Sequence, residues 1–227
     1  MREDKKILGL VLARGGSKAV PHKNIKELNG RPLMSYIIEQ AKKSKYLKEV
    51  WVSSDEREIL KIADEWGALG LQRPKELSDG SKPIQAIQHW SESMKEMNGG
   101  YDIMVLLNAC CPLTLTEDID EAIRIALETD CDSVTSLVED FSSHPSKLCR
   151  LDDDKVVGLG ETFETGERQK QDHIFKRNTA IYLSKKEVID QGLLFGKDTR
   201  GYVMSKERSW DINDMWDWAV AEFLVKR

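Results

Sequence analysis

The sequence predicts an α/β fold built around a mostly parallel sheet, and two observations support that prediction. Short apolar runs alternate along the chain with stretches in which apolar residues recur at helical spacing, which is the pattern of successive βαβ units. The run 101–107 is apolar almost throughout, as expected for a strand that helices cover on both faces. A chain of 227 residues can bury an ample core, and we expect a single domain over residues 1–227.

In the first half of the chain, the apolar pattern separates strands from helices. Pro32 stands where a helix would begin, because its fixed φ suits the first helical turn. Ile59, Ile62, Ala63 and Trp66 follow the i, i+3, i+4, i+7 spacing of one helix face. We therefore expect strands at 7–13, 50–53, 69–71 and 101–107, and helices at 32–45, 59–66 and 84–98.

The second half resumes the pattern after one long interruption. Residues 139–177 are polar and contain glycine, and we expect an excursion from the core with a small hairpin lobe near Val156 and Val157. A capping box from Ser184 to Glu187 predicts the start of a short helix. The remaining expected elements are helices at 117–127 and 216–224 and strands at 133–138, 179–183 and 202–205.

Composition limits the classes of partner. Charged residues make up 32% of the chain and the net charge is −5, which argues against broad binding to nucleic acid or to an anionic membrane. An anionic ligand must therefore be attracted by a local basic cluster. The sequence has no apolar stretch near eighteen residues and no signal-peptide pattern, so we expect a cytoplasmic or nuclear protein. The four cysteines have no metal-binding spacing, which suits reduced thiols.

The chain is organised around residues 9–24. An apolar run ends in Arg14, Gly15, Gly16 and Ser17, and two lysines, Lys18 and Lys23, follow closely. Glycine can adopt positive φ and present successive N–H groups to one anion, while the basic side chains supply charge. The stretch predicts a strand that leads into a phosphate-binding loop. The alternative is a glycine turn between a strand and a solvated basic loop.

Ligands of open parallel sheets bind outside the carboxyl ends of the strands, which would gather the loops after residues 13, 53 and 107 with the turn near Asp211. Neither GxxxxGK[ST] nor GxGxxG follows a strand, so a P-loop NTPase and a Rossmann dehydrogenase are both disfavoured. Asp211 and Asp214, which flank Asn213, are suited to holding Mg²⁺ beside a triphosphate. The alternative is that Asn213 or Asp214 caps the last helix.

The stretch LARGGSKAVPHKNIKELNGRPL at residues 12–33 resembles the signature of CMP-N-acylneuraminate (sialic acid) synthetases and related cytidylyltransferases for nine-carbon ulosonic acids. Further stretches match in the same order: VWVSSDEREI at 50–59, LLNACCPLTLTEDI at 106–119, HPSK at 144–147, 168–182 ending in NTAIY, and ERSWDIND at 207–214. The resemblance implies a Rossmann-like three-layer α/β/α nucleotidyltransferase fold with a mostly parallel sheet and a small dimerisation lobe at 139–177.

The resemblance also implies roles for individual residues, with Arg14, Lys23 and Asp211 as the catalytic groups. Arg14, Lys18 and Lys23 would bind the phosphates of CTP. The nucleotide would also contact Ala13, Gly15, Gly16, Asn24, Ser78 and Ser81. The sugar acid would contact Asn108, Lys147, Arg168, Asn178, Tyr182 and Phe195. Asp211 and Asn213 would occupy the two positions of the metal site, with Mg²⁺ as the cofactor.

Three positions depart from the family pattern. Asn108 stands where the family usually has glutamine, which could resize the sugar site. Cys110 and Cys111 replace hydroxyl residues, whose hydrogen bonds a thiol makes poorly. Asn213 replaces the second aspartate of a D-x-D pair, so a second Mg²⁺ should bind more weakly.

The expected activity is attack by the anomeric hydroxyl of an ulosonic acid on the α-phosphorus of CTP, which releases pyrophosphate and forms a CMP-sugar. We expect a homodimer in which Lys147 or Arg168 serves the partner's site. Two alternatives remain open at this stage. One is a nucleotidyltransferase of the same fold that uses a sugar 1-phosphate and another NTP. The other is a catalytically weakened, nucleotide-binding regulatory homologue, suggested by Asn108, the cysteine pair and Asn213.

Overall fold

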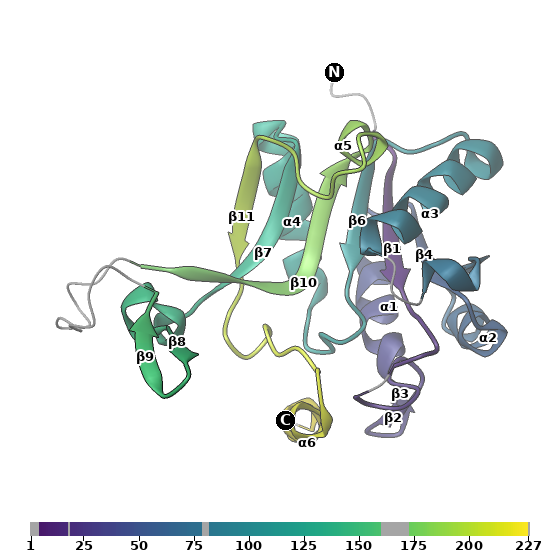
Figure 1. The fold of residues 1–227 in the computed structure, drawn as a ribbon. Coiled ribbons are helices and arrows are strands. Elements are labelled where there is room, and N and C mark those ends of the chain that lie inside the picture. Colours follow the sequence, from purple (N-terminus) through teal and green to yellow (C-terminus); the bar gives the residue numbers. More distant parts are fainter. Residues whose placement is uncertain (1–4, 18, 79–81, 160–172, 227) are drawn as a thin grey trace.

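The structure, a computed structural model, describes residues 5–17, 19–78, 82–159 and 173–226 and centres on a seven-stranded sheet (Figure 1). The strand order is β11 (Thr199–Val203), β7 (Ser133–Glu139), β10 (Phe175–Lys185), β6 (Ile103–Leu107), β1 (Ile7–Leu12), β4 (Glu49–Ser54) and β5 (Leu69–Gln72). β10 runs antiparallel to both of its neighbours, and the other pairings in the sheet are parallel. The predicted α/β fold with a mostly parallel sheet is confirmed.

Helices cover both faces of this sheet. α1 (Leu33–Lys43), α2 (Arg57–Glu65) and α4 (Thr116–Thr129) bury one face, and α3 (Pro83–Asn98) and α5 (Lys186–Asp190) bury the other. The central strand β1 shows why, since successive strand side chains point to opposite faces. Ile7 and Val11 pack with the first group of helices, and Leu8 and Leu10 pack with the second. Because both the odd-numbered and the even-numbered positions of β1 carry apolar side chains, each face of the sheet needs a covering layer of helices.

Two hairpins extend from the core. β2 (Glu27–Leu28) pairs with β3 (Arg31–Pro32), and the turn residues Asn29 and Gly30 both have positive φ, as a tight Asn-Gly hairpin requires. This hairpin was not expected from the sequence. β8 (Cys149–Asp152) pairs with β9 (Lys155–Gly158), which confirms a small hairpin around Val156 and Val157. In Figure 1 the β8–β9 hairpin extends away from the sheet beyond β7.

The sheet is longer in its second half than the sequence indicated. β7 continues to Glu139 and β10 begins at Phe175, and these two residues pair across the strands. The predicted excursion at 139–177 is therefore too wide, because Glu139 at one end and residues 175–177 at the other pair in the sheet. The last strand lies at 199–203 rather than 202–205, where it pairs in parallel with β7.

The predicted capping box at Ser184 is wrong. Ser184 is buried in β10, and its hydroxyl donates to the carbonyl of Leu194. The short helix α5 begins at Lys186 without a side-chain cap. Three single turns of 3₁₀-helix complete the described elements, at Lys75–Leu77, Phe141–Ser143 and Pro145–Lys147. Among the described residues, no helix combines the length and apolar character needed to cross a lipid bilayer.

The last helix, α6 (Met215–Val225), lies beyond the carboxyl ends of the parallel strands, on the same side as β2 and β3 (Figure 1). A separate apolar cluster holds it there. Val20, Leu28 and Leu33 from the first part of the chain pack with Ile212 and Trp218 from the last part. This packing brings the two ends of the sequence together at the edge of the sheet where a ligand site is expected.

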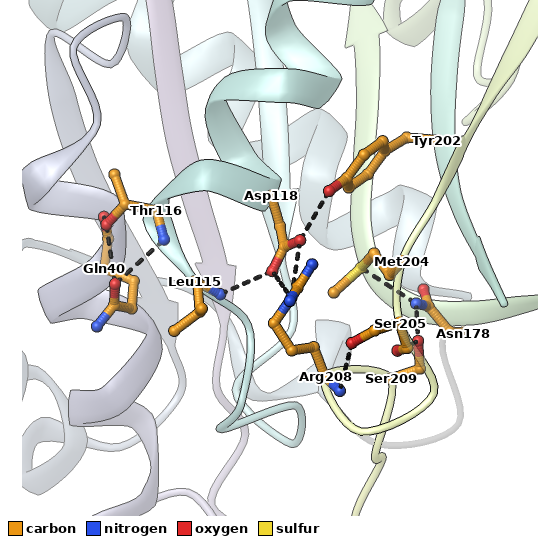
Figure 2. Close-up of polar contacts among 10 residues, drawn as sticks. All are labelled: Gln40, Leu115, Thr116, Asp118, Asn178, Tyr202, Met204, Ser205, Arg208 and Ser209. Carbon is orange, nitrogen blue, oxygen red and sulfur yellow. Dashed lines mark hydrogen bonds and ion pairs between the residues drawn. The ribbon is translucent and has the colours of Figure 1, made fainter.

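A buried carboxylate fixes the segment that leads into α6 (Figure 2). Asp118, which is fully buried in the first turn of α4, accepts hydrogen bonds from Leu115 N at 3.0 Å, the Tyr202 hydroxyl at 2.8 Å and Arg208 Nε at 2.9 Å. The carboxylate raises the pKa of the Arg208 guanidinium, while burial is the first cause that raises the pKa of Tyr202 to about 12. Since the Arg208 side chain is 37% exposed, the pair joins the core to a surface segment.

Arg208→Ala should lower the free energy of unfolding by about 3 kcal/mol, because it leaves the buried Asp118 carboxylate without its cation. The matched control is Arg200→Ala, which removes an exposed pair with Asp198 and should leave the free energy of unfolding nearly unchanged, because water and salt screen such a pair. Urea unfolding of both variants checks the difference. Equal losses would show that the Asp118–Arg208 pair does not anchor the segment.

Candidate active site

A cleft of about 470 Å³ opens at the carboxyl edge of the sheet. Its volume lies within the usual range for sites that bind small molecules. Six residues predicted for the site line it, namely Arg14, Lys23, Asn24, Ser78, Asn108 and Asn213, together with Leu12, Ser17, Ala19, Val20, Arg73, Leu77, Pro83, Ala86 and Cys110. The fold thus brings the loops after β1, β5 and β6 together with the segment before α6.

The glycine loop has a different geometry from the one expected. Gly15 lies outside the left-handed region, and its N–H donates to Asp55 Oδ1 at 3.2 Å. A Cβ at this position would lie 1.8 Å from Glu56 Oε1, so the glycine allows the Glu56 side chain to approach the backbone. The prediction that Gly15 adopts positive φ is therefore wrong. The loop can attract an anion mainly through the side chains of Arg14 and Lys23.

Asn24 and Lys23 fix the shape of this loop. Asn24 is 6% exposed, and its Nδ2 donates to the carbonyl of Arg14 at 2.9 Å. The Lys23 ammonium donates to the carbonyl of Ile212 at 2.8 Å, and Ile212 N donates to the carbonyl of Cys110 at 2.9 Å. The basic loop is thus bonded directly to the segment that carries Asp211 and Asn213.

Arg73 is a cleft residue that sequence reasoning missed. It is 4% exposed, and it donates from Nη1 to the carbonyl of Ser53 at 2.6 Å and from Nε to Ser78 Oγ at 2.9 Å. Asp55 lies 3.8 Å from its Nη2. Burial lowers the pKa of Arg73, and the Asp55 carboxylate opposes that shift. The available signal was an arginine directly after a short strand, at the ligand-binding edge of the sheet.

Asp211 contacts β10 at a bulge, where the register of β10 against β7 shifts between Arg177 and Tyr182. Its Oδ2 accepts hydrogen bonds from Thr179 Oγ1 at 3.2 Å and Asn213 Nδ2 at 3.3 Å. Its Oδ1 is buried and has no hydrogen-bond partner among the described residues. Thr179 has φ 63°, which is uncommon for a β-branched residue and typical of strain held at functional sites. The Asp211 carboxylate is therefore held through Oδ2, while Oδ1 has no hydrogen bond from the described residues.

Asp214 has a structural role instead. Its side chain accepts from the N–H groups of Trp216 at 2.8 Å and Asp217 at 2.9 Å, which makes it the N-cap of α6. Of the two caps considered from the sequence, Asp214 is thus the one observed. Asn213 is left beside Asp211, and both residues line a second hollow of about 420 Å³. Because Asn213 lines both hollows, Arg14 and Asp211 border adjoining parts of one site.

A hard cation such as Mg²⁺ fits this donor set. Mg²⁺ prefers oxygen ligands and is usually held by one or two carboxylates together with phosphate oxygens and water. The unpartnered Oδ1 of Asp211 supplies one such oxygen, and the side chain of Asn213 lies beside it.

Two of the residues predicted to contact the sugar, Tyr182 and Phe195, form an aromatic pair. Tyr182 and Phe195 pack edge to face with ring centres 5.2 Å apart, and the Arg177 guanidinium lies 5.5 Å from the Phe195 ring centre. Burial raises the pKa of Tyr182, and the nearby Asp211 carboxylate adds to the rise. Neither ring is among the residues that line the two hollows.

Asn178 is buried with its amide fully engaged. Its Oδ1 accepts from the Ser136 hydroxyl and from Ala180 N, and its Nδ2 donates to Ser209 Oγ at 2.8 Å and to Met204 Sδ at 3.1 Å (Figure 2). These bonds hold the bulge of β10 to the segment before α6. A contact between Asn178 and a sugar would require one of them to be exchanged.

Lys147 lies apart from the cleft within one chain. It is exposed beside the β8–β9 hairpin, and its ammonium donates to the carbonyl of Phe141 at 3.0 Å. It lines a separate hollow with Asp140 and Lys206. Three other predicted residues, Lys18, Ser81 and Arg168, lie outside the described residues.

The cysteine pair borders the site. Cys110 is half-buried, and its thiol donates to Asn108 Oδ1 at 3.0 Å. Cys111 is fully buried, and its thiol donates to the carbonyl of Asn178 at 3.8 Å. The hydrogen bond with Cys110 and burial raise the pKa of Cys111, which keeps its thiol neutral and unreactive. The geometry therefore gives no support to a covalent cysteine intermediate.

Iodoacetamide at pH 8 should alkylate Cys149, which is exposed, at least about tenfold faster than Cys111, because thiolate fraction and access control the rate. Buried Cys131 serves as the internal reference for a thiol protected by packing. Peptide mass spectrometry of a time course gives the three rates. Alkylation of Cys111 ahead of Cys149 would identify Cys111 as an activated nucleophile.

An open α/β sheet whose carboxyl edge pairs cationic side chains with a carboxylate is the arrangement of an enzyme that handles phosphate esters. The family model described as Cytidylyltransferase matches residues 8–197, and the chain belongs to that family.

Individual relatives agree with this assignment. The chain is 35% identical over 229 residues to N-acylneuraminate cytidylyltransferase A of Danio rerio, with 100% of this chain and 52% of that protein covered. It therefore spans about half the length of that relative. It is 30% identical to the CMP-N,N'-diacetyllegionaminic acid synthase of Legionella pneumophila, with 97% of each chain covered. Among solved structures, CMP:2-keto-3-deoxy-manno-octonic acid synthetase complexed with CTP has the same fold, with a TM-score of 0.75, 14% identity, and 97% of this chain and 98% of that chain covered.

Proposed function

We propose that this chain transfers CMP from CTP to the anomeric hydroxyl of a nine-carbon ulosonic acid, releases pyrophosphate and forms a CMP-sugar. The family and the names of the two relatives support the reaction class and the type of acceptor. The observation that carries the proposal is that Asn213 lines both hollows. The cleft lined by Arg14 and Lys23 meets there the hollow lined by Asp211, whose Oδ1 is buried without a hydrogen-bond partner among the described residues.

Arg14 and Lys23 would bind the triphosphate. Both line the cleft, and their charges oppose the negative charge that the departing pyrophosphate carries. Lys23 also donates to the Ile212 carbonyl, so it holds the carboxylate segment in place while it faces the phosphates. Arg73 and Ser78 would shape the wall near the base, where their mutual hydrogen bond fixes both side chains.

Asp211 and Asn213 would hold Mg²⁺. When bound, Mg²⁺ supplies positive charge that offsets the charge of the phosphate oxygens. Asn213 offers a carbonyl oxygen without a charge, and its Nδ2 donates to Asp211, so the pair carries one formal negative charge where the family pattern has two. We infer weaker cation binding by the protein alone and a larger contribution from the oxygens of CTP.

The acceptor would lie between the nucleotide and the aromatic pair. Asn108 lines the cleft and accepts a hydrogen bond from the Cys110 thiol, so we place the anomeric hydroxyl beside this side chain, where it must meet the α-phosphorus. The hydroxyl oxygen forms a bond to that phosphorus as the bond to the bridging oxygen of pyrophosphate breaks, and the hydroxyl proton passes to solvent. Positioning of the two substrates is the main contribution expected of the protein.

We also propose a homodimer formed through the β8–β9 hairpin. Leu151, Val156 and Leu159 are apolar side chains there that are 71%, 50% and 60% exposed. Lys147 lies on the same lobe, away from its own cleft, and would serve the neighbour's site. Light scattering at micromolar concentration tests this directly, and a monomer would contradict it.

A pyrophosphate-release screen should show turnover with CTP and a nine-carbon ulosonic acid, at a rate at least about tenfold above that with UTP, ATP or GTP. Sialic, legionaminic and pseudaminic acids are the acceptors to compare. Turnover only with a sugar 1-phosphate and another NTP would favour the first alternative. Binding of CTP without turnover, even in excess Mg²⁺ or Mn²⁺, would identify a weakened homologue.

Arg14→Ala should raise the KM for CTP about 10- to 100-fold, because one charge-assisted hydrogen bond to phosphate is worth about 1.5–3 kcal/mol. Arg200→Ala is the control, since its side chain lies at the other end of the sheet and pairs with Asp198. Steady-state kinetics with varied CTP give both values. An unchanged KM for CTP in Arg14→Ala would remove the phosphate role.

A further inference from the structure

The cysteine pair and Asp211 form a cluster of potential metal ligands. The sulfur atoms of Cys110 and Cys111 and one carboxylate oxygen of Asp211 all lie within 4.8 Å of one another. The spacing of the cysteines did not predict this cluster, because the third ligand comes from a position about one hundred residues further along the chain. The fold brings the three together where the Cys110 carbonyl accepts the N–H of Ile212.

We propose that Cys110, Cys111 and Asp211 form a binding site for a thiophilic divalent cation of the Zn²⁺ type. Zn²⁺ binds thiolate sulfur at about 2.3 Å and carboxylate oxygen at about 2.0–2.2 Å. Two sulfurs on one tetrahedral zinc lie about 3.8 Å apart, so side-chain rotations that shorten the donor-to-donor distances by about 1 Å would bring the three donors to ligand distance. On binding, each thiol releases its proton to solvent and forms a sulfur–metal bond.

Two further observations support a cation at this position. Asp211 Oδ1 is buried and has no hydrogen-bond partner in the described part of the chain. The partners of the Cys111 thiol are distant, since it lies 3.8 Å from the Asn178 carbonyl and 3.9 Å from Thr179 Oγ1. The Cys110 thiol donates to Asn108 Oδ1 at 3.0 Å, a bond that metal binding would exchange. A bound cation would replace these contacts with stronger bonds and would satisfy the carboxylate oxygen.

The choice of cation follows from the donor atoms. Thiolate sulfur is a soft ligand that favours Zn²⁺ over Mg²⁺, which prefers oxygen. Three protein ligands leave a fourth position open. Cys110 lines the cleft, so that position faces the space assigned to the nucleotide. The two cations would share Asp211, so Zn²⁺ and Mg²⁺ would exclude each other there; this last point rests on the proposed function.

Cobalt substitution tests the site without any need for turnover. The purified protein should bind about one Co²⁺ with an absorption band for sulfur-to-metal charge transfer, and Zn²⁺ should displace the band stoichiometrically. Cys110→Ser and Cys111→Ser should each remove most of the band and weaken Zn²⁺ binding at least tenfold in competition with a chromophoric chelator. Asp211→Asn should weaken Zn²⁺ binding while part of the band remains.

Two variants serve as matched controls. Cys131→Ser introduces a hydroxyl at another buried thiol, and Cys149→Ser removes an exposed thiol, and both should keep the wild-type band. Circular dichroism checks the fold of each variant. If buried Cys111→Ser does not fold, half-buried Cys110→Ser decides the question.

The proposal is overturned if wild type gives no sulfur-to-metal band, if the band follows Cys131 or Cys149, or if Cys110→Ser binds Zn²⁺ as tightly as wild type. A titration of the Co²⁺ protein with Mg²⁺ and CTP separates this site from the proposed function. Displacement of Co²⁺ supports both. A thiolate band that Mg²⁺ and CTP leave unchanged keeps the Zn²⁺ site and contradicts the role of Asp211 in holding Mg²⁺.

Discussion

The site depends on the bonds that Ile212 makes to two distant parts of the chain. Its N–H donates to the carbonyl of Cys110, and its carbonyl accepts from the ammonium of Lys23. Its side chain is fully buried with Leu28 and Trp218. Since a hydrogen bond from a charged donor contributes about 1.5–3 kcal/mol, this junction is strong enough to hold the acidic segment beside the basic loop. Without it, Asp211 would have no fixed position relative to the cleft.

Two buried polar side chains, Asp118 and Asn178, hold the segment that precedes Asp211. Asp118 holds Arg208, and Asn178 holds Ser209, so the chain enters Asp211 from a fixed direction. Such support is needed because the site keeps an unfavourable backbone conformation at Thr179 and an unpaired carboxylate oxygen. Local strain of this kind costs of order 1–3 kcal/mol and persists only where the surrounding structure determines it. These contacts with the sheet therefore hold the Asp211 carboxylate in a fixed position with one oxygen unpaired among the described residues.

Sequence reasoning predicted the parts of the fold that follow from periodicity. The strands of the parallel core and the gathering of their carboxyl-end loops depend on apolar patterns that are strong in the sequence, and six of the proposed residues line the cleft. The strand ends at Glu139 and Phe175 were missed because ladder pairing there depends on the neighbouring strand rather than on the composition of the segment. Ser184 gave a false helix start because its hydroxyl has a tertiary partner.

The missed features of the site arise from contacts between distant segments. Arg73 gains its place from the carbonyl of Ser53, and Gly15 is required by the approach of Glu56 rather than by its own φ. The cluster of two thiols with Asp211 is likewise invisible to local spacing. These cases share one cause: the sequence indicates which side chains can do chemistry at the sheet edge, while only the folded chain determines which of them meet.

The central claim is that the basic loop and the acidic segment close on one nucleotide. A crystal structure with CTP and with Mn²⁺ in place of Mg²⁺ tests it most directly, because Mn²⁺ is located by its anomalous scattering. The account predicts triphosphate density against Arg14 and Lys23, and anomalous density about 2.0–2.2 Å from an oxygen of Asp211 on the same nucleotide. Phosphates bound away from Arg14, or a metal that does not contact Asp211, would contradict it.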